Sequence, residues 1–155
     1  MSKTLRLILG DQLNSQHSWF QEVNDSVTYV LMEIRSETDY ATHHIQKIVG
    51  FFAAMRQFAN ELLVKKHHVI YLKLTDNTNL QSFEKNIERI LNSENFERFE
   101  YQLPDEYRVD LILKNFSARL LISNAVVDTE HFFSTRNELA DLFEGKKSFL
   151  MESFY

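Results

Sequence analysis

The chain has 155 residues, of which 44% are hydrophobic and 25% are charged, which is the size and composition of one globular domain. It contains no cysteine, which excludes disulfide bonds and any cysteine-ligated zinc or iron–sulfur site within the chain. Its net charge of −5 excludes the globally basic surface that is typical of nucleic-acid-binding domains. No apolar run approaches the ~20 residues that span a bilayer, so we expect a cytoplasmic protein with no membrane partner.

Short apolar runs alternate with stretches of helical periodicity along the whole chain. The runs predict β-strands at residues 5–9, 27–32, 69–72, 96–103 and 120–122. The periodic stretches predict helices at residues 45–63, 80–91 and 105–116, the second with Asn79 as its N-cap. Strands that alternate with helices favour an α/β fold. We expect a Rossmann-like, doubly wound sandwich, in which a five-stranded, mainly parallel sheet carries helices on both faces.

Polar turns follow the first, second and fourth predicted strands, at the sheet edge where open α/β folds bind their ligands. Asp11, Glu33 and Glu37 come from the first two of these turns, and we expect their carboxylates to converge at one rim. Carboxylates accept hydrogen bonds from ring N–H and hydroxyl groups, so a polar heterocycle is a suitable ligand. The alternative is that Asp11 and Glu37 cap helix N-termini. Gly10 lacks the further glycines of a dinucleotide fingerprint or a phosphate loop, which argues against those sites.

The six histidines include two adjacent pairs, at residues 43–44 and 67–68. Neighbours on a helix point about 100° apart, so His43 and His44 do not suit one metal ion, and no H-E-x-x-H motif is present. We expect a solvated or helix-capping role for the first pair and loop positions for the second. Trp19 is expected to be a packing anchor.

The turns also carry a resemblance to a known family. The sequence resembles the photolyase-related proteins, also called bacterial iron–sulfur cryptochromes and (6-4) photolyases, in the blocks LRLILGDQLN (5–14), EIRSETDYATHHIQKI (33–48), FFAAMRQFA (51–59), HHVIY (67–71), PDEYRV (104–109), EHFFS (130–134) and GKKSFLMESFY (145–155). The blocks occur in order from one end of the chain to the other. Of these, the combination of G-D-Q-L with E-x-x-x-E-x-x-Y-x-x-H-H-x-x-K is the most specific.

The resemblance implies a division of labour within a longer protein. Residues 1–145 would be the N-terminal α/β antenna domain, and residues 146–155 the start of a linker to a missing C-terminal helical domain. That domain would hold FAD and a four-cysteine iron–sulfur cluster and would contact damaged DNA. The antenna domain is similar to those that bind 6,7-dimethyl-8-ribityllumazine, whose light energy serves DNA repair or blue-light sensing. The full-length family member would be a DNA photolyase, a lyase, and this chain alone would be inactive.

The resemblance also assigns residues to the antenna site. They belong to the loop after the first strand, the turn after the second strand and the long helix: Gly10, Asp11, Gln12, Glu33, Glu37, Tyr40, Lys47 and Phe51. Phe51 matches a position beside the antenna ring that is usually aliphatic. Its ring would therefore either stack on the lumazine or fill its place.

Two other functions stay open on the sequence. One is a stand-alone nucleotide- or flavin-binding regulator, and the other is an interaction module. Residues 148–155 are apolar and rich in rings, so we expect this tail to pack against the missing domain or to cause self-association. A cysteine-bearing helical region encoded after residue 155 would favour the photolyase-related assignment over both alternatives.

Overall fold

The computed structural model describes residues 3–150, 152 and 154. Its strands are β1 (Thr4–Leu7), β2 (Val27–Met32), β3 (His68–Leu72), β4 (Arg98–Gln102) and β5 (Ser123–Val127). Its helices are α1 (Arg35–Thr38), α2 (Ile45–Val64), α3 (Phe83–Glu94), α4 (Tyr107–Ser117) and α5 (Glu138–Phe143), with a short 3-10 helix η1 (Ser18–Phe20). Within this described part, no helix is long and apolar enough to cross a bilayer.

All five strands are parallel and lie in the order β3-β2-β1-β4-β5, which confirms the predicted α/β fold. The chain moves outward from β1 to β3 and then crosses back to β4 on the other side of β1. The strand order therefore reverses between β1 and β4. In an open parallel sheet the carboxyl ends at such a reversal form the usual ligand crevice.

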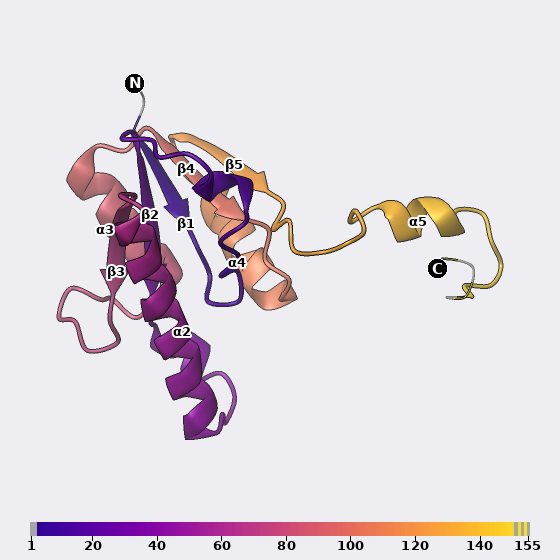
Figure 1. Cartoon of the computed structure of the whole chain (residues 1–155), viewed down its shortest axis with the longest axis horizontal. Coiled ribbons are helices and arrows are strands. Elements are labelled where there is room, and N and C mark those ends of the chain that lie inside the picture. The colour runs from indigo at the N-terminus through magenta and orange to yellow at the C-terminus, as the bar shows by residue number, and fades with distance from the viewer. Residues whose placement is uncertain (1–2, 151, 153, 155) are drawn as a thin grey trace.

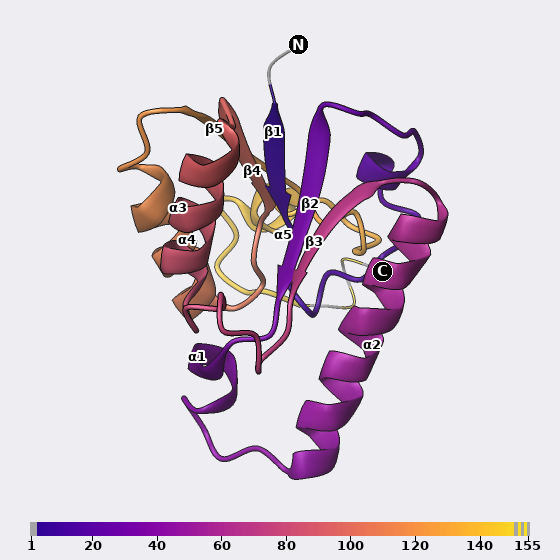
Figure 2. The same ribbon diagram turned by 90° about the vertical axis from the view of Figure 1, so that its left-hand side faces the viewer.

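Helices cover both faces of the sheet, as predicted (Figure 2). On one face, α3 and α4 pack on the strands around Leu7, Phe99 and Tyr101. On the other face, α2 and η1 pack on Ile8 and Tyr29. All six residues of β2 are buried, as expected of a parallel strand with both faces covered.

Two predicted element boundaries were wrong. The last strand is not at residues 120–122 but at Ser123–Val127, because the apolar residues that precede it form the turn after α4 and leave Leu121 fully exposed. β5 is an edge strand with half-exposed side chains, so it lacks an apolar run. The predicted cap of α3, Asn79, lies before the helix and is buried; its amide donates to the carbonyl oxygens of Glu33 (2.6 Å) and Lys73 (2.9 Å). The helix begins after Ser82.

The second histidine pair lies only in part in a loop: His67 precedes β3, as predicted, whereas His68 belongs to the strand. His68 is the first residue of β3. His67 is buried, and its ring meets the edges of Tyr29 and Phe20 with centroids 5.5 and 6.3 Å away. Burial lowers the pKa of His67 below its ordinary value. Trp19 is buried beside these rings, in agreement with its predicted packing role.

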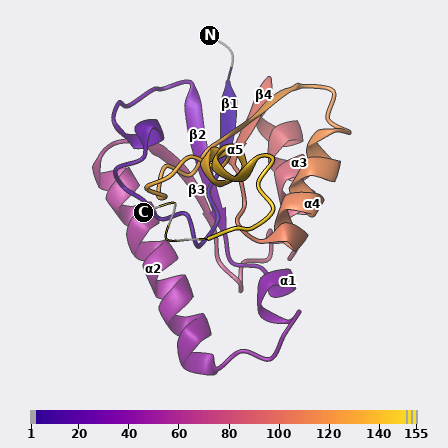
Figure 3. The ribbon, with the colours of Figure 1, turned by 90° about the vertical axis from the view of Figure 1, so that its right-hand side faces the viewer.

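The chain leaves the sheet after β5, and α5 stands apart from it (Figure 1; Figure 3 views α5 from its own side). The ring of Phe143 is sheltered by the edge of Phe149, with centroids 5.4 Å apart, and by the Lys146 ammonium at 5.3 Å. Phe149 itself is 68% exposed. The apolar tail predicted to associate, residues 148–155, includes residues 151, 153 and 155, which lie outside the described residues.

Candidate functional site

A cavity of about 200 Å³ lies at the carboxyl ends of β1 and β4, where the strand order reverses. The turn with α1, the start of α2 and the start of α4 surround this end of the sheet (Figure 2). The cavity's apolar wall comes from Ile8, Met32, Phe52, Met55, Phe83 and Val109. Its polar lining comes from Asp11, Glu37, Tyr40, His43, Lys47 and Glu106. An apolar pocket with a few convergent polar groups is the usual form of a small-molecule site.

Six of the eight residues assigned from the sequence line this cavity, although they come from separate segments: Gly10, Asp11, Glu37, Tyr40, Lys47 and Phe51. Gln12 and Glu33 do not line it. The expectation that three carboxylates converge therefore applies to Asp11 and Glu37, whereas Glu33 points elsewhere. A ligand-binding role of the six lining residues stays a prediction.

The Glu33 carboxylate is fully buried between α2 and β3. It accepts two hydrogen bonds from the guanidinium of Arg56 (2.6 and 2.9 Å), one from the Tyr71 hydroxyl (2.7 Å) and one from the Leu74 backbone N–H (2.9 Å). Burial alone would raise the pKa of Glu33, but these donors outweigh it and lower that pKa. With its acceptor sites occupied, Glu33 supports the end of β2 and has no lone pair free for a ligand.

The Gln12 side chain holds the loop after β1 in place through hydrogen bonds to backbone groups. Its side-chain oxygen accepts from the Leu9 N–H (3.1 Å), and its amide donates to the carbonyl oxygens of Gln102 (3.2 Å) and Leu103 (3.4 Å). The side chain is buried and ties the end of β1 to the end of β4. Gln12 therefore positions Gly10 and Asp11 instead of lining the cavity.

Arg108, in the first turn of α4, organises the rim. Its guanidinium donates to both oxygens of Glu37 (3.1 and 2.9 Å) and to Glu106 (2.8 Å), and it lies over the Tyr40 ring at 4.3 Å. The hydrogen bond to Glu37 is the main cause of the raised pKa of Arg108. The alternative role of Glu37 as a helix N-cap does not match its contacts, because both oxygens of its carboxylate accept hydrogen bonds from Arg108. The sequence predicts a polar turn here, but it does not indicate that Arg108 links the turn after β4 to the turn after β2.

Asp11 is the rim carboxylate without a cationic partner among the described contacts. Loss of water around its carboxyl group raises the pKa of Asp11, and the carboxylates of Asp105 and Glu106 add to that rise. No helix begins directly after Asp11, so it does not act as the predicted alternative, an N-cap. A hydrogen-bond donor or a cation from a ligand would relieve this unpaired charge.

Gly10 allows a close approach of α2 to the loop after β1. A side chain at this position would put its Cβ 2.6 Å from Cζ of Phe51 and 2.9 Å from Sδ of Met55. The Phe51 ring therefore rests on the backbone at Gly10, while 41% of the residue stays exposed. The ring of Phe51 was predicted either to stack on a ligand or to fill the ligand's place, and its packing on Gly10 favours the second role.

The first histidine pair lies at the start of α2. His44 is the N-cap, and its Nδ1 accepts from the Gln46 N–H (3.2 Å), so the predicted capping role is confirmed. His43 packs against the edge of the Tyr40 ring and lies 3.4 Å from the Lys47 ammonium. Within residues 3–150, 152 and 154, no cluster of three side chains suited to a metal ion is found.

The sequence matches, over residues 6–155, the family described as deoxyribodipyrimidine photo-lyase-related protein. The chain belongs to this family. It is also similar to a curated relative, the (6-4) photolyase of Agrobacterium fabrum (strain C58 / ATCC 33970), with 34% identity over 152 residues. The alignment covers 97% of this photolyase-related chain and 30% of the relative, so the chain spans less than a third of that protein's length.

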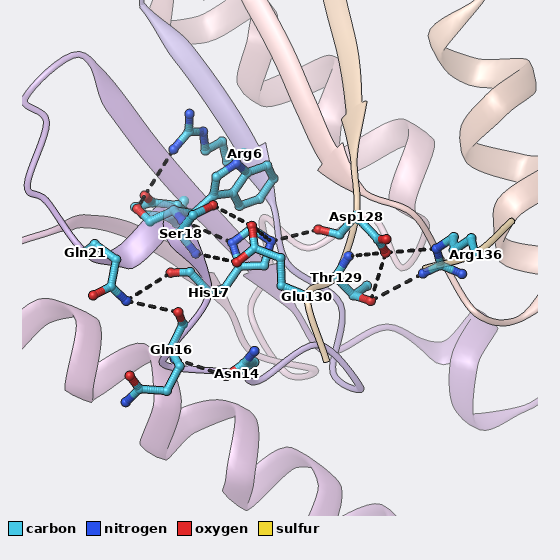
Figure 4. A network of polar contacts seen from close by, with 12 residues as sticks. Arg6, Asn14, Gln16, His17, Ser18, Gln21, Asp128, Thr129, Glu130 and Arg136 are labelled. Atoms are coloured by element: carbon cyan, nitrogen blue, oxygen red, sulfur yellow. Dashed lines mark hydrogen bonds and ion pairs between the residues drawn. The ribbon is translucent and has the colours of Figure 1, made fainter. Parts of the chain in front are cut away.

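The segment that leaves β5 is anchored to the loop that carries Gly10 and Asp11 in this photolyase-related domain (Figure 4). His17 is fully buried; its Nδ1 accepts from the Trp19 N–H, so its Nε2 carries the proton and donates to the Asp128 carbonyl (2.8 Å). The Ser18 N–H and hydroxyl both donate to the Glu130 carboxylate (2.9 and 2.6 Å).

The same segment reaches the cavity rim. His131 and Arg136 lie 3.0 and 3.1 Å from the Asp105 carboxylate. The negative charge of Asp105 in turn helps to raise the pKa of Asp11. Arg136 also pairs with Asp128 at 2.8 Å. We call residues 128–136 the exit segment. It is tied both to the loop before η1 and to the turn after β4.

Replacing His17 by Leu should release the exit segment, because the Asp128 carbonyl and the Trp19 N–H then lose their partners. We expect a loss of about 1–3 kcal/mol in unfolding free energy, and faster amide exchange in residues 128–136. Hydrogen exchange with mass spectrometry measures the second effect. Ser18→Ala is the milder comparison, since it removes one partially exposed hydrogen bond. Unchanged exchange in both variants would show that His17 does not hold this segment.

Proposed function

We propose that this chain is the antenna-chromophore-binding domain of a photolyase- or cryptochrome-related protein, and that 6,7-dimethyl-8-ribityllumazine binds in the cavity at the strand reversal. The observation that carries this proposal is the meeting of three separate segments in one cavity. Six residues that the family resemblance assigns to the antenna site line this cavity. The bound lumazine would supply absorption of blue light.

The chemistry of the lining fits such a ligand. A lumazine presents a flat ring with carbonyl oxygens and one ring N–H, and a chain of hydroxyl groups. Asp11 and Glu37 offer carboxylate acceptors, Tyr40 and Lys47 offer donors, and Phe52 and the methionines offer apolar contact. At about 200 Å³ the cavity is smaller than the ~300–1,000 Å³ of typical ligand sites. Movement of Phe51, the half-exposed ring at Gly10, would enlarge it.

Each rim residue would have a distinct task. Arg108 holds the Glu37 carboxylate and the Tyr40 ring in place, so these groups are oriented before any ligand arrives. Asp11, which has no such partner, would gain a hydrogen bond from the ligand. The apolar side chains beneath exclude water, which strengthens the polar contacts above them.

Titration of the lumazine into the purified chain, followed by ligand fluorescence, tests the proposal. We expect binding by the wild type, and affinity about ten- to a hundredfold lower for Asp11→Ala, because a charge-assisted hydrogen bond contributes ~1.5–3 kcal/mol. Asp25→Asn is the matched control, since that side chain is 96% exposed at the opposite end of the sheet. Its affinity should equal that of the wild type.

Phe51→Leu separates the two roles of the ring. If the ring fills the site, as its packing on Gly10 favours, the variant binds the lumazine more tightly than the wild type does. If the ring stacks on the ligand, the variant binds more weakly. An absence of binding by the wild type and by Phe51→Leu would contradict the antenna proposal. Binding of riboflavin or a nucleotide in its place would favour the regulator alternative.

The proposal extends to the longer protein. FAD, an iron–sulfur cluster and contact with damaged DNA would belong to a C-terminal domain outside this chain, consistent with a chain that has no cysteine and a net charge of −5. The isolated chain should then purify without FAD and should not repair (6-4) lesions. Whether the longer protein repairs DNA or senses light depends on that domain.

A further inference from the structure

The turn after β4 takes part in the cavity and in the attachment of the exit segment. Pro104 and Glu106 line the cavity. Between them, Asp105 meets the exit segment: its Oδ1 accepts from the Arg136 guanidinium (3.1 Å), and its Oδ2 lies 3.0 Å from Nε2 of His131. These three side chains are only 27–32% exposed. The turn is therefore the place where the cavity rim and the exit segment meet.

The rim is rich in carboxylates, and the exit segment supplies part of the charge that balances them. The carboxylates come from the turns after β1, β2 and β4: Asp11, Glu37, Asp105 and Glu106. Arg108 pairs with Glu37 and Glu106. Among the described residues, the side chains that pair with Asp105 both come from the exit segment. The charges of the rim are therefore not balanced without this segment.

The pKa of Asp11 reflects the charges on both sides of the turn. Burial raises this pKa, the carboxylate of Asp105 raises it further, and His131 opposes the rise. Asp11 lines the cavity, whereas no residue of the exit segment does so. The exit segment thus acts through its charge on a group of the cavity.

Docking of the exit segment on the turn rests on side chains. Arg136 bridges Asp105 to the start of the segment, because it also donates to Asp128 (2.8 Å) and to the Thr129 hydroxyl (3.3 Å) (Figure 4). No backbone hydrogen bond joins the segment to this turn in the part of the chain that the structure describes. Phe133 is fully exposed, so apolar burial adds little. Since partly exposed ion pairs are individually weak, the docked and released forms lie close in free energy.

We propose that the exit segment completes the cavity rim, so that its docking on Asp105 and ligand binding in the cavity favour each other. In the docked form Arg136 balances Asp105, and the turn after β4 is held where Arg108 orients Glu37. In the released form Asp105 is left unpaired beside other carboxylates, and repulsion moves the turn away from the rim. Arg136 is therefore a positioning residue that acts through Asp105.

This link rests on the proposed lumazine site and adds a way to regulate it. A ligand that binds better to the docked form must also stabilise that form, because coupling between two sites is reciprocal. Filling the cavity would thereby fix the exit segment and communicate occupancy to the chain that follows residue 136.

Hydrogen exchange of the ligand-free chain tests the link between segment and rim. Arg136→Gln should speed exchange about fivefold in residues 128–136 and also in residues 34–40, the turn after β2, since coupling between sites is usually fivefold or more. Lys3→Gln is the matched control. It breaks a partly exposed pair with Glu94 (3.0 Å) before β1, at the opposite end of the sheet, and should change neither segment. Unchanged exchange of residues 27–32 shows that the fold stays intact.

The variant Asp105→Asn determines whether Arg136 acts through Asp105. Without this carboxylate no charge is left to balance, so adding Arg136→Gln should have no further effect on residues 34–40. If Arg136→Gln speeds exchange there as much in the Asp105→Asn background as in the wild type, Arg136 acts elsewhere and the proposal is wrong.

The lumazine gives a second measurement. At saturation it should slow exchange of residues 128–136 about fivefold, and Arg136→Gln should bind it more weakly by up to the same factor. Lys3→Gln should bind it as the wild type does. A wild type that binds no lumazine contradicts the antenna proposal, and the ligand-free comparison then decides the link. Unchanged exchange of residues 34–40 in Arg136→Gln overturns the link, as does lumazine binding that leaves the exit segment unprotected.

Discussion

Replacing Arg56 by Met should lower the unfolding free energy of the chain by about 3 kcal/mol, because the buried Glu33 carboxylate then loses its cation. Glu33 has no exposed side-chain surface, whereas the Arg56 side chain is 52% exposed. The charge left behind is thus the buried one. Tyr71 and Leu74 still donate to it, so the loss should lie toward the lower end of the 3–5 kcal/mol expected for a broken buried pair. Chemical denaturation at pH 7 measures it.

The pH dependence of stability should also change. In the wild type the pKa of Glu33 is lowered from its ordinary 4.5, so its stabilising contribution is present above that pH and is lost as the pH falls through the lowered value. In Arg56→Met, burial acts without the cation and raises that pKa. Protonation of Glu33 then removes the unpaired buried charge from the variant. The difference in unfolding free energy between the variant and the wild type should therefore shrink as the pH falls from 7 toward 4.

Arg119→Met is the control for this prediction. Arg119 pairs with Glu84 at 2.9 Å on the surface, where the two side chains are 68% and 41% exposed. Such pairs contribute between zero and about 1 kcal/mol. If Arg56→Met costs no more than Arg119→Met, Glu33 is not the buried anchor that its hydrogen bonds indicate.

The sheet could be predicted from the sequence because its central strands are buried on both faces. Residues 27–32 form an apolar run interrupted only by Thr28, and such runs between helical stretches indicate parallel strands. The edge strand β5 could not be placed in the same way, since Ser123–Val127 is half-exposed and carries polar residues. Its apolar neighbours at 120–122 gave the stronger pattern and led to the wrong boundary.

The candidate site was predictable as far as the turns that form it, but not in its pairings. Asp11 and Glu37 line one cavity because parallel strands end at the same edge. Whether a carboxylate faces that cavity depends on which cation it meets from another element. Glu33 meets Arg56 of α2, and Glu37 meets Arg108 of α4, at separations of 23 and 71 residues along the chain. No local pattern in the sequence encodes such contacts.

Replacing Gly10 by Ala should destabilise the chain by about 1–3 kcal/mol, the usual cost of overpacking. The new Cβ would lie 2.6 Å from Cζ of Phe51 and 2.9 Å from Sδ of Met55, so the aromatic ring must move. Gly50→Ala is the matched control, since its Cβ would meet nothing and helix propensity should make it neutral or slightly stabilising. Denaturation at low protein concentration compares the two.

Combining Gly10→Ala with Phe51→Leu tests whether the clash of the new methyl group arises from the Phe51 ring. Phe51 is 41% exposed, so shortening it should cost little by itself. In the double variant Gly10→Ala/Phe51→Leu the smaller side chain leaves room for the methyl group, and we expect about 1 kcal/mol or more of the Gly10→Ala loss to be recovered. Additive losses would place the clash at Met55 instead. Recovery would mean that the size of residue 51 sets the space above Gly10, which is the space that the proposed lumazine ligand would occupy.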